Sequence, residues 1–293
     1  MPLAILGPTA SGKSSLAVEL AGRTGGPVIN GDPFQCLLGL EIGTGQPGEG
    51  ERRGVPHLGY GDLPPSYRPN PAEFGARVRS WLQGQQGAVL VTGSGLYLRG
   101  IWEQLDDLPP VPEATVAKVR SLGARLGAAA LHRFLAAVDP RRATQLHPND
   151  GSRVQRALSL HLATGRRPSD LLGGLQRGVP EGWKALLVLP SRGSQLKRVA
   201  RRVRAQVAAG WREEAARLVA GGFGPDLEAL RPLGYADWLT GEAPQACVRR
   251  IIQATQAYAK RQSTFFRNQW PEIPLWDPDQ EDVEAALRKL GLE

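Results

Sequence analysis

A glycine-rich segment near the start of the chain has the residue types and the spacing of a phosphate-binding loop. The pattern G-x-x-x-x-G-K-[ST] is matched, between an apolar run and an amphipathic stretch, by Gly7-Pro8-Thr9-Ala10-Ser11-Gly12-Lys13-Ser14. In such a loop the backbone N–H groups bind phosphate oxygens, the lysine adds a positive charge, and the serine hydroxyl can bind Mg²⁺. We predict that this segment binds two or more linked phosphates and that Ser14 is the metal ligand.

A phosphate-binding loop leaves the reaction open. The chain fits a small-molecule or nucleotide kinase, in which ATP fills the loop and Asp32 accepts a hydroxyl proton. It also fits a transferase of a diphosphate ester, and an RNA-binding module whose loop senses a nucleotide. Asp32 follows the apolar pair Val28–Ile29, where the ends of parallel strands place ligands, although a capping or turn role suits an isolated Asp there better.

Four short apolar runs must position these residues. Each run is bounded by Gly or Pro, and long amphipathic stretches separate them. They are Leu3–Leu6, Val28–Ile29, Ala88–Val91 and Ala185–Leu189. This alternation predicts an α/β fold with a mostly parallel sheet, of the P-loop NTPase type.

A helical region interrupts this pattern between the third and fourth runs. Asp106–Pro112 predicts a rigid hinge, and Gly173–Pro180 closes the region. Apolar residues recur at helical spacing within it, at Leu131, Phe134, Leu135 and Val138. We therefore predict a helical insertion domain at 108–178 in a catalytic core formed by 1–107 and 179–293, with helices from Leu196 to the end.

The composition is that of an ordinary folded protein. Of the 293 residues, 41% are hydrophobic and 22% are charged, which argues against disorder and against a fibrous protein. The net charge of +8 and the pI near 9.9 favour a polyanionic partner, although a basic solvated surface explains them as well. Cys36 and Cys247 have no metal-ligand spacing and suit a reducing cytoplasm. Because we find no signal sequence and no long apolar run, we expect no membrane partner.

Five segments, taken in order, carry a resemblance to a known family. They are the phosphate loop; Asp32-Pro33-Phe34-Gln35 with Leu40-Glu41-Ile42-Gly43-Thr44; Thr92-Gly93-Ser94-Gly95-Leu96-Tyr97-Leu98; His147-Pro148-Asn149-Asp150 with Arg153 and Arg156-Ala157-Leu158; and Ala259-Lys260-Arg261-Gln262-Ser263-Thr264-Phe265-Phe266-Arg267. Together they span nearly the whole chain and resemble the tRNA dimethylallyltransferases, also called tRNA isopentenyltransferases. No Cys/His cluster follows the last segment, so the resemblance is to the bacterial members of the family.

The resemblance implies transfer of a dimethylallyl group from dimethylallyl diphosphate to N6 of adenosine 37, beside the anticodon of tRNA, with release of diphosphate. N6 is a poor nucleophile because its lone pair is delocalised into the ring, so the family's carboxylate base is expected at Asp32. Charge on the leaving diphosphate would be met by Lys13, by Ser14 with Mg²⁺, and by Arg202. Arg202 lies in a basic helix, for which a solvated face is the alternative. Ser94, where the family has Thr, could bind the diphosphate or the base, or simply suit its turn.

The resemblance also implies contacts with the anticodon stem-loop of tRNA. The target base must leave its stack to be reached, and Gln35 offers a donor and an acceptor to an adenine edge. Basic and aromatic residues near the C-terminus suit RNA binding, although Tyr258, Phe265 and Phe266 also fit a helix's core stripe. The residues predicted to bind tRNA are Asp32, Pro33, Phe34, Gln35, Ser94, Ser152, Arg153, Val154, Gln155, Arg156, Arg231, Gly234, Tyr235, Lys260, Arg261, Gln262, Phe265 and Arg267.

Several residues depart from the family's pattern. Pro33 stands where Ser is usual, Leu37 where Tyr is usual, and Thr92 where Gly is usual. Leu38 and Gln46 replace basic residues. The predicted catalytic set is whole, but the polar groups around it are fewer, so we expect base recognition or rate to differ from the typical enzyme. We expect Mg²⁺ as the cofactor and a cytoplasmic monomer as the active form.

Overall fold

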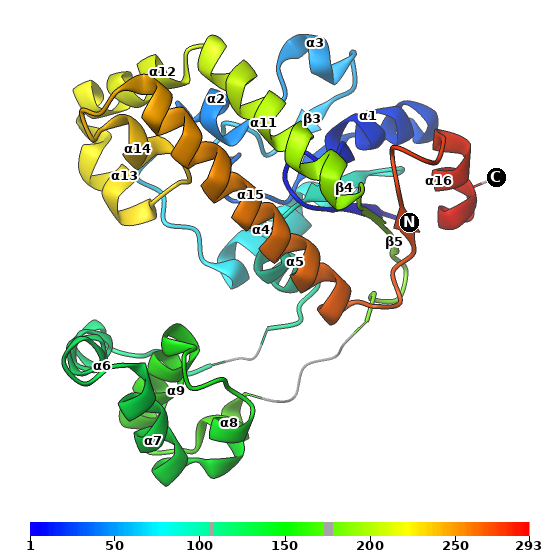
Figure 1. The fold of residues 1–293 in the computed structure, drawn as a ribbon. Helices are drawn as coiled ribbons and strands as arrows, with labels where there is room; N and C mark the ends of the chain where they lie inside the picture. The colour runs from blue at the N-terminus through cyan, green and yellow to red at the C-terminus, as the bar shows by residue number, and fades with distance from the viewer. Residues whose placement is uncertain (106–107, 173–177, 293) are drawn as a thin grey trace. The chain divides into compact units, whose positions relative to one another are not determined.

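The computed structural model describes residues 1–105, 108–172 and 178–292. They divide into two compact units (Figure 1): a larger one of Met1–Glu103 with Arg177–Glu293, and a smaller one of Gln104–Gln176. The start of the predicted hinge at Asp106–Pro112 and much of the closing stretch Gly173–Pro180 lie outside the described residues. The domain boundaries predicted beside them stay predictions.

A parallel sheet forms the centre of the larger unit. Among the described residues it has six strands in the order β3-β2-β4-β1-β5-β6, and all five neighbouring pairs are parallel. The strands are β1 (Leu3–Leu6), β2 (Val28–Asn30), β3 (His57–Leu58), β4 (Val89–Thr92), β5 (Lys184–Val188) and β6 (Leu275–Trp276). The predicted α/β fold with a mostly parallel sheet is confirmed. The prediction of helix throughout from Leu196 onward is wrong at β6, because a two-residue strand has no periodicity to detect.

Helices cover both faces of this sheet because alternate strand residues point to opposite sides. Leu3 and Ile5 of β1 belong to the core on one face, and Ala4 and Leu6 belong to the core on the other. The first face packs against α1 (Lys13–Thr24) and α16 (Val283–Leu290), and the second against α4 (Pro71–Leu82), α5 (Gly95–Ile101) and α15 (Pro244–Gln269).

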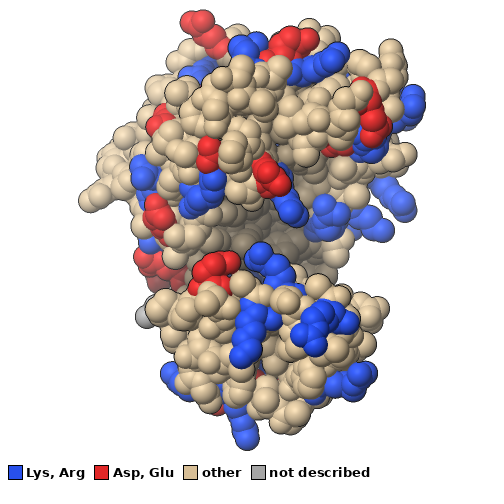
Figure 2. Space-filling model, turned by 90° about the vertical axis from the view of Figure 1, so that its left-hand side faces the viewer, with Lys and Arg blue, Asp and Glu red and all other residues tan. Residues whose placement is uncertain are grey.

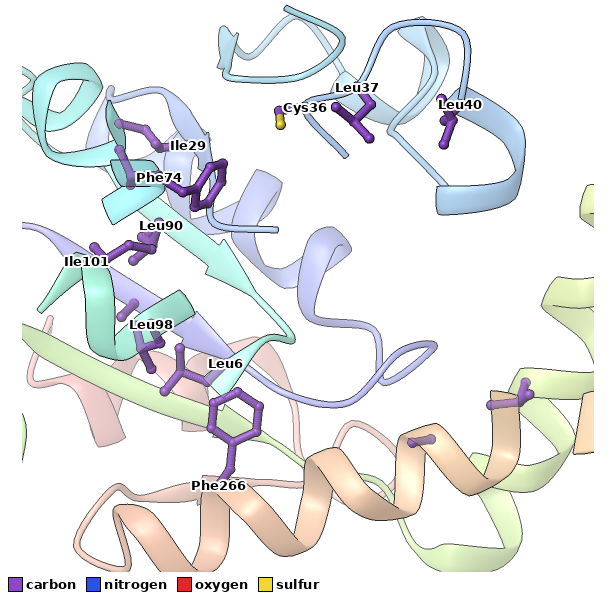
Figure 3. Packing of buried hydrophobic residues seen from close by; sticks show 14 of the residues in the cluster. Leu6, Ile29, Cys36, Leu37, Leu40, Phe74, Leu90, Leu98, Ile101 and Phe266 are labelled. Carbon is purple, nitrogen blue, oxygen red and sulfur yellow. The ribbon is translucent and has the colours of Figure 1, made fainter. Parts of the chain in front are cut away.

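The second core fixes the helices that border the strand ends. Figure 3 shows Leu6 between Leu98 of α5 and Phe266 of α15, with Phe74 and Ile29 farther along the same core. Complete burial of such a side chain stabilises a fold by about 1.5–3 kcal/mol. The core therefore holds the helices beside the carboxyl ends of the strands in fixed positions.

One long basic helix crosses the larger unit beside α15. This helix, α11 (Arg192–Ala208), buries Val199 and Val203 at a spacing of one turn. Arg198 and Arg202 precede these two residues by one position and flank the buried stripe. The other helical segments of the unit are α2 (Glu41–Thr44), α3 (Glu49–Arg52), α12 (Trp211–Leu218), a π-helical segment (Val219–Phe223), α13 (Gly224–Leu230) and α14 (Tyr235–Trp238).

The described part of the smaller unit is helical. Its helices are α6 (Glu113–Leu126), α7 (Ala128–Val138), α8 (Pro140–Thr144), α9 (Gly151–Thr164) and α10 (Pro168–Leu171). Leu131 and Leu135 of the predicted spacing enter its core, whereas Phe134 is 47% exposed. The buried Asp139 accepts hydrogen bonds from Arg142 N (2.9 Å) and Ser169 N (2.6 Å), so one carboxylate ties α8 to α10.

Candidate active site

The phosphate-binding loop joins β1 to α1, as its sequence pattern requires. Gly7 has φ +156° and a Cβ there would lie 2.5 Å from Val188 O, so only glycine fits. Gly12, with φ +98°, leads into the first turn of α1. The loop therefore leads directly to the N-terminus of α1, which favours an anion.

Two glutamines brace this loop from neighbouring helices. Thr9 N donates to Gln262 Oε1 (2.8 Å), and Gln262 Nε2 donates to Gly93 O (2.7 Å) in the turn after β4. Gln195 of α11 donates to Thr9 O. Both glutamines are more than 90% buried. Gln262 was predicted to bind tRNA, but in the structure its amide connects two loops inside the larger unit.

A cavity of about 920 Å³ opens beside the loop within the larger unit. Residues of the loop, of α11 and of the segment that contains α3 form its walls. The charged and hydroxyl-bearing residues that line it are Ser11, Lys13, Ser14, Ser15, Glu41, Glu51, Arg53, Tyr60, Arg198, Arg201 and Arg202. Of the predicted diphosphate-binding residues, Ala10–Ser14 and Arg202 line this cavity, whereas Gly7, Pro8 and Thr9 do not.

Two cations that line the cavity, Lys13 and Arg202, interact electrostatically with the carboxylate of Asp32, which is not among the lining residues. Burial and the nearby Arg202 lower the pKa of Lys13 to about 8, while Asp32 acts against them. Burial lowers the pKa of Arg202 as well, against the charges of Glu51 and Asp32. Burial raises the pKa of Asp32, although the Phe34 N–H and the charges of both cations oppose the increase. The three groups therefore lie close enough to share one electrostatic field.

A turn at the end of β2 holds Asp32. Asp32 N donates to Asn30 Oδ1 (2.8 Å), and Asn30 Nδ2 donates to the carbonyl oxygens of Asp32 (2.9 Å) and Gly59 (2.7 Å). The carboxylate accepts the Phe34 N–H through Oδ1 (3.0 Å). Asp32 therefore has the turn role that was considered for it, and the same hydrogen bonds hold its carboxylate in one position.

Ser94 lies at the end of the adjacent strand. Thr92 Oγ1 donates to Gly31 O (2.7 Å) and accepts the Ser94 N–H (3.0 Å), so it joins the ends of β4 and β2. Thr92 is one of the departures from the family's pattern, and its hydroxyl links the turns that carry Asp32 and Ser94. Ser94 begins α5 without a side-chain capping bond.

Three tyrosines near Asp32 were not among the predicted site residues. Burial and then the charge of Asp32 raise the pKa of Tyr97 to about 12. The same two causes raise the pKa of Tyr60 and of Tyr258. Tyr97 lies within the Gly-Leu-Tyr-Leu segment, which was the available signal. Phenol groups from three separate segments therefore feel the charge of this carboxylate.

Gln35 and Arg202 hold the same two carbonyl groups. Gln35 Nε2 donates to Thr44 O (3.0 Å) and Gly45 O (2.9 Å). Arg202 Nη2 donates to the same oxygens at 3.2 and 3.5 Å. The amide hydrogens of Gln35 are thus used, and its Oε1 remains to accept from an amino group.

The remaining predicted RNA-binding residues of the larger unit fall into three groups by exposure. Four cations are exposed, namely Arg231, Lys260, Arg261 and Arg267. Phe34 is half-buried, and so is Phe265, whose ring fills the space beside Gly95, while Phe266 belongs to the core. Pro33, Gly234 and Tyr235 are buried. The RNA contacts predicted for the buried residues stay predictions, and each would require the interior to open.

In the smaller unit, the predicted segment lies on α9. Ser152, Arg153 and Arg156 are exposed, whereas Val154 is fully buried in the core. Gln155 is half-buried and faces Gly123 of α6. On the face of this unit that Figure 2 displays, Lys and Arg dominate the charged side chains. The exposed residues are available to a polyanion, and Val154 is not.

The described residues contain no group of three or more His, Cys, Asp or Glu that could hold a metal by themselves. The exposed Ser14 hydroxyl and the carboxylate of Glu51 line the same cavity. Hard oxygen donors of this kind suit Mg²⁺, which commonly keeps several waters and binds together with substrate phosphates. Within the described ranges, no helix is both long and apolar enough to cross a membrane.

Comparison with known proteins places the chain in a family. A family model described as IPP transferase matches residues 35–269, and one described as Isopentenyl transferase matches residues 3–58. A tRNA dimethylallyltransferase of Rhodospirillum centenum is 40% identical over 99% of this chain and 96% of its own. The corresponding protein of Geobacter metallireducens is 37% identical over 92% of both chains.

Solved structures agree with this result. The tRNA isopentenylpyrophosphate transferase of Bacillus halodurans is 28% identical, with a TM-score of 0.66 over 99% of this chain and 96% of its own. A eukaryotic dimethylallyltransferase acting on tRNA has the same fold, with a TM-score of 0.78 at 23% identity over 97% of this chain and 77% of its own. The chain therefore belongs to the IPP transferase family, among the tRNA dimethylallyltransferases.

Proposed function

We propose that the chain transfers a dimethylallyl group from dimethylallyl diphosphate to N6 of the adenosine beside the anticodon of tRNA. The observation that carries this proposal is the electrostatic coupling of Lys13, in the loop after β1, and Arg202, of α11, to Asp32, in the turn after β2. Two cations suit a diphosphate, and a carboxylate suits the removal of a proton from a weak nucleophile.

Asp32 is assigned the role of general base. As N6 attacks carbon 1 of the dimethylallyl group, the bond from that carbon to the diphosphate oxygen breaks and its electron pair leaves with the diphosphate. The N6 proton passes to the Asp32 carboxylate. Burial raises the pKa of Asp32, which makes the carboxylate a better proton acceptor, while the charges of Lys13 and Arg202 oppose that increase and favour the ionised form.

The leaving diphosphate is assigned to the phosphate loop. Lys13, the loop amides and Arg202 provide fixed positive charge and donors where negative charge increases. Mg²⁺, held by Ser14 with Glu51 near it, would supply further neutralisation of the phosphate oxygens when bound. Ser94 lies beside the Asp32 turn, at the start of α5, and its hydroxyl makes no capping bond to that helix. We assign this hydroxyl to a contact with the substrate.

Recognition of tRNA is assigned to residues of both units. Gln35 Oε1 is placed to accept from the amino group of a base taken out of its stack. The exposed cations of α15 and of α9 would bind phosphates of the RNA backbone. We assign the reaction to a monomer in the cytoplasm, because tRNA is used in the cytoplasm.

The direct test is to incubate the protein with tRNA, Mg²⁺ and labelled dimethylallyl diphosphate, with labelled ATP as the comparison. Label from the prenyl donor should enter the tRNA. A product labelled from ATP, with none in tRNA, would instead support the small-molecule or nucleotide kinase. Binding of nucleotide and RNA without either product would support the RNA-binding module.

Replacement of the base separates its role from folding. Asp32→Asn keeps an acceptor for the Phe34 N–H but cannot take a proton, so the rate of transfer should fall by about 10²- to 10⁴-fold. Binding of tRNA, measured by filter retention, should change little. Asp62→Asn removes an exposed carboxylate that follows the neighbouring strand β3 and should leave the rate unchanged. Equal loss of rate in both variants would contradict the assignment.

A further inference from the structure

A buried carboxylate outside the proposed catalytic set holds one short turn of the larger unit. Glu214 of α12 is 2% exposed. Its Oε2 accepts the Ile42 N–H (2.7 Å), and its Oε1 accepts the Gly43 N–H (2.9 Å) and the Tyr235 hydroxyl (2.7 Å). Three donors therefore converge on one ionisable group, and two of them are backbone amides of α2.

The other end of α2 carries the carbonyl groups that Gln35 and Arg202 share. Thr44 O and Gly45 O accept from both side chains. A turn of five residues thus links the Glu214 carboxylate, at its amide end, to two side chains of the proposed site, at its carbonyl end. Any shift of the amide end moves the carbonyl end, because a turn this short has little internal freedom.

Side chains pack closely around both glycines of the turn. A Cβ on Gly43 would lie 2.1 Å from Trp211 Nε1 and 2.5 Å from the Tyr235 hydroxyl. A Cβ on Gly45 would lie 1.9 Å from Arg202 Nη2. Gln206 of α11 also donates to Gly43 O (3.1 Å). Both glycines of the turn are therefore in direct contact with the groups that it connects.

We infer that Glu214 is a positioning residue which, with Tyr235, holds residues 41–45 so that Arg202 faces the diphosphate and Gln35 faces the target base. This inference rests on the proposed function. It gives Tyr235 a role different from its predicted contact with RNA: its hydroxyl secures the carboxylate, and it acts on the substrates through the turn.

The first test is Glu214→Gln, which keeps the volume but replaces one acceptor oxygen by an amide donor. At least one backbone N–H of the turn then faces a donor, so Arg202 loses its fixed position. Binding of inorganic pyrophosphate, measured by calorimetry, should weaken by about tenfold. Transfer should lose about 100-fold in kcat, and the KM for tRNA should rise because Gln35 uses the same carbonyls.

Glu213→Gln is the matched control, because Glu213 is the exposed neighbour in the same helix. It should leave pyrophosphate binding, kcat and KM unchanged. Tyr235→Phe removes one of the three donors and should weaken pyrophosphate binding slightly, in the same direction. That variant keeps the test informative if Glu214→Gln fails to fold.

A double-variant comparison separates positioning from mere stability. In an Arg202→Ala background the contact to be positioned is gone, so Glu214→Gln should weaken pyrophosphate binding by less than about twofold. The same tenfold loss in both backgrounds would overturn the inference. So would a lower unfolding temperature in Glu214→Gln with pyrophosphate binding and kcat intact. Wild-type protein that binds pyrophosphate but transfers no label would refute the proposed function alone.

Discussion

At the scale of single residues, the charge of Lys13 is the most sensitive quantity in the site. Burial and Arg202 lower its pKa from the ordinary 10.5 to about 8, against the opposing effect of Asp32. Only the ammonium form attracts a phosphate. The free protein therefore has this attraction almost fully a pH unit or more below its pKa of about 8, keeps half of it near that value and loses it as the pH rises further.

We predict that pyrophosphate binding to the wild type weakens above about pH 8, approaching tenfold per pH unit until the higher pKa of the bound state is reached. The reason is that a neutral Lys13 must take up a proton in order to bind the anion. Lys13→Arg stays charged throughout and should lack this additional loss, which corrects for titration of pyrophosphate itself. Calorimetry in buffers of different ionisation enthalpy measures both affinity and proton uptake. Parallel pH profiles for the two proteins would contradict a lowered pKa.

The sequence predicts the position of some single residues and not of others. A segment such as Arg231 to Tyr235 contains the residue types that bind RNA, and nothing in its spacing reveals that the tyrosine is fully buried. Its burial depends on Trp211 and Glu214, which are more than twenty positions away in the sequence. Lys13 differs, because the strand, loop and helix that position it are contiguous in the sequence.

At the scale of elements, Gln262 connects three parts of the fold. From α15 its amide accepts the Thr9 N–H of the phosphate loop and donates to Gly93 O after β4. The loop that carries the predicted diphosphate ligands and the loop that carries Ser94 are therefore held in fixed positions relative to one another. Helix α15 thus fixes the turns that follow β1 and β4, which lie far from it in the sequence.

Gln262→Glu should disrupt this connection without changing its size. The carboxylate can still accept from Thr9 N, but it places an oxygen against Gly93 O and leaves that carbonyl without its donor. We expect the free energy of unfolding in urea, followed by circular dichroism, to fall by about 1–3 kcal/mol. Pyrophosphate binding should weaken as the loop loosens. Gln253→Glu, at an exposed position of α15, should change neither quantity, and similar losses in both variants would argue against the brace.

Elements differ in how far the sequence predicts them. The strands β1, β2, β4 and β5 were predicted because a strand buried on both faces reads as an uninterrupted apolar run. The outer strands β3 and β6 have two residues each, and Leu275 of β6 is 45% exposed. These two strands form because a neighbouring strand pairs with them, and not because of their own residues. No local sequence pattern could therefore predict them.

At the scale of the whole molecule, the two units carry different kinds of positive charge. Two cations of the cavity in the larger unit, Lys13 and Arg202, are partly enclosed, and burial lowers their pKa values. Those on α9 of the smaller unit are exposed. Enclosed cations suit a small anion, whereas exposed ones suit the counterion release that accompanies binding of a long polyanion.

This difference predicts that binding of tRNA and binding of diphosphate can be separated by single substitutions. Arg156→Ala should weaken tRNA binding several-fold and reduce the slope of log affinity against log salt by about 0.7–0.9, the value for one phosphate contact. Pyrophosphate affinity should not change. Arg217→Ala removes an equally exposed charge from α12 of the larger unit and has the same effect on net charge. If both variants reduce the slope equally, tRNA responds only to net charge; if Arg156→Ala alone does, α9 contacts the RNA backbone.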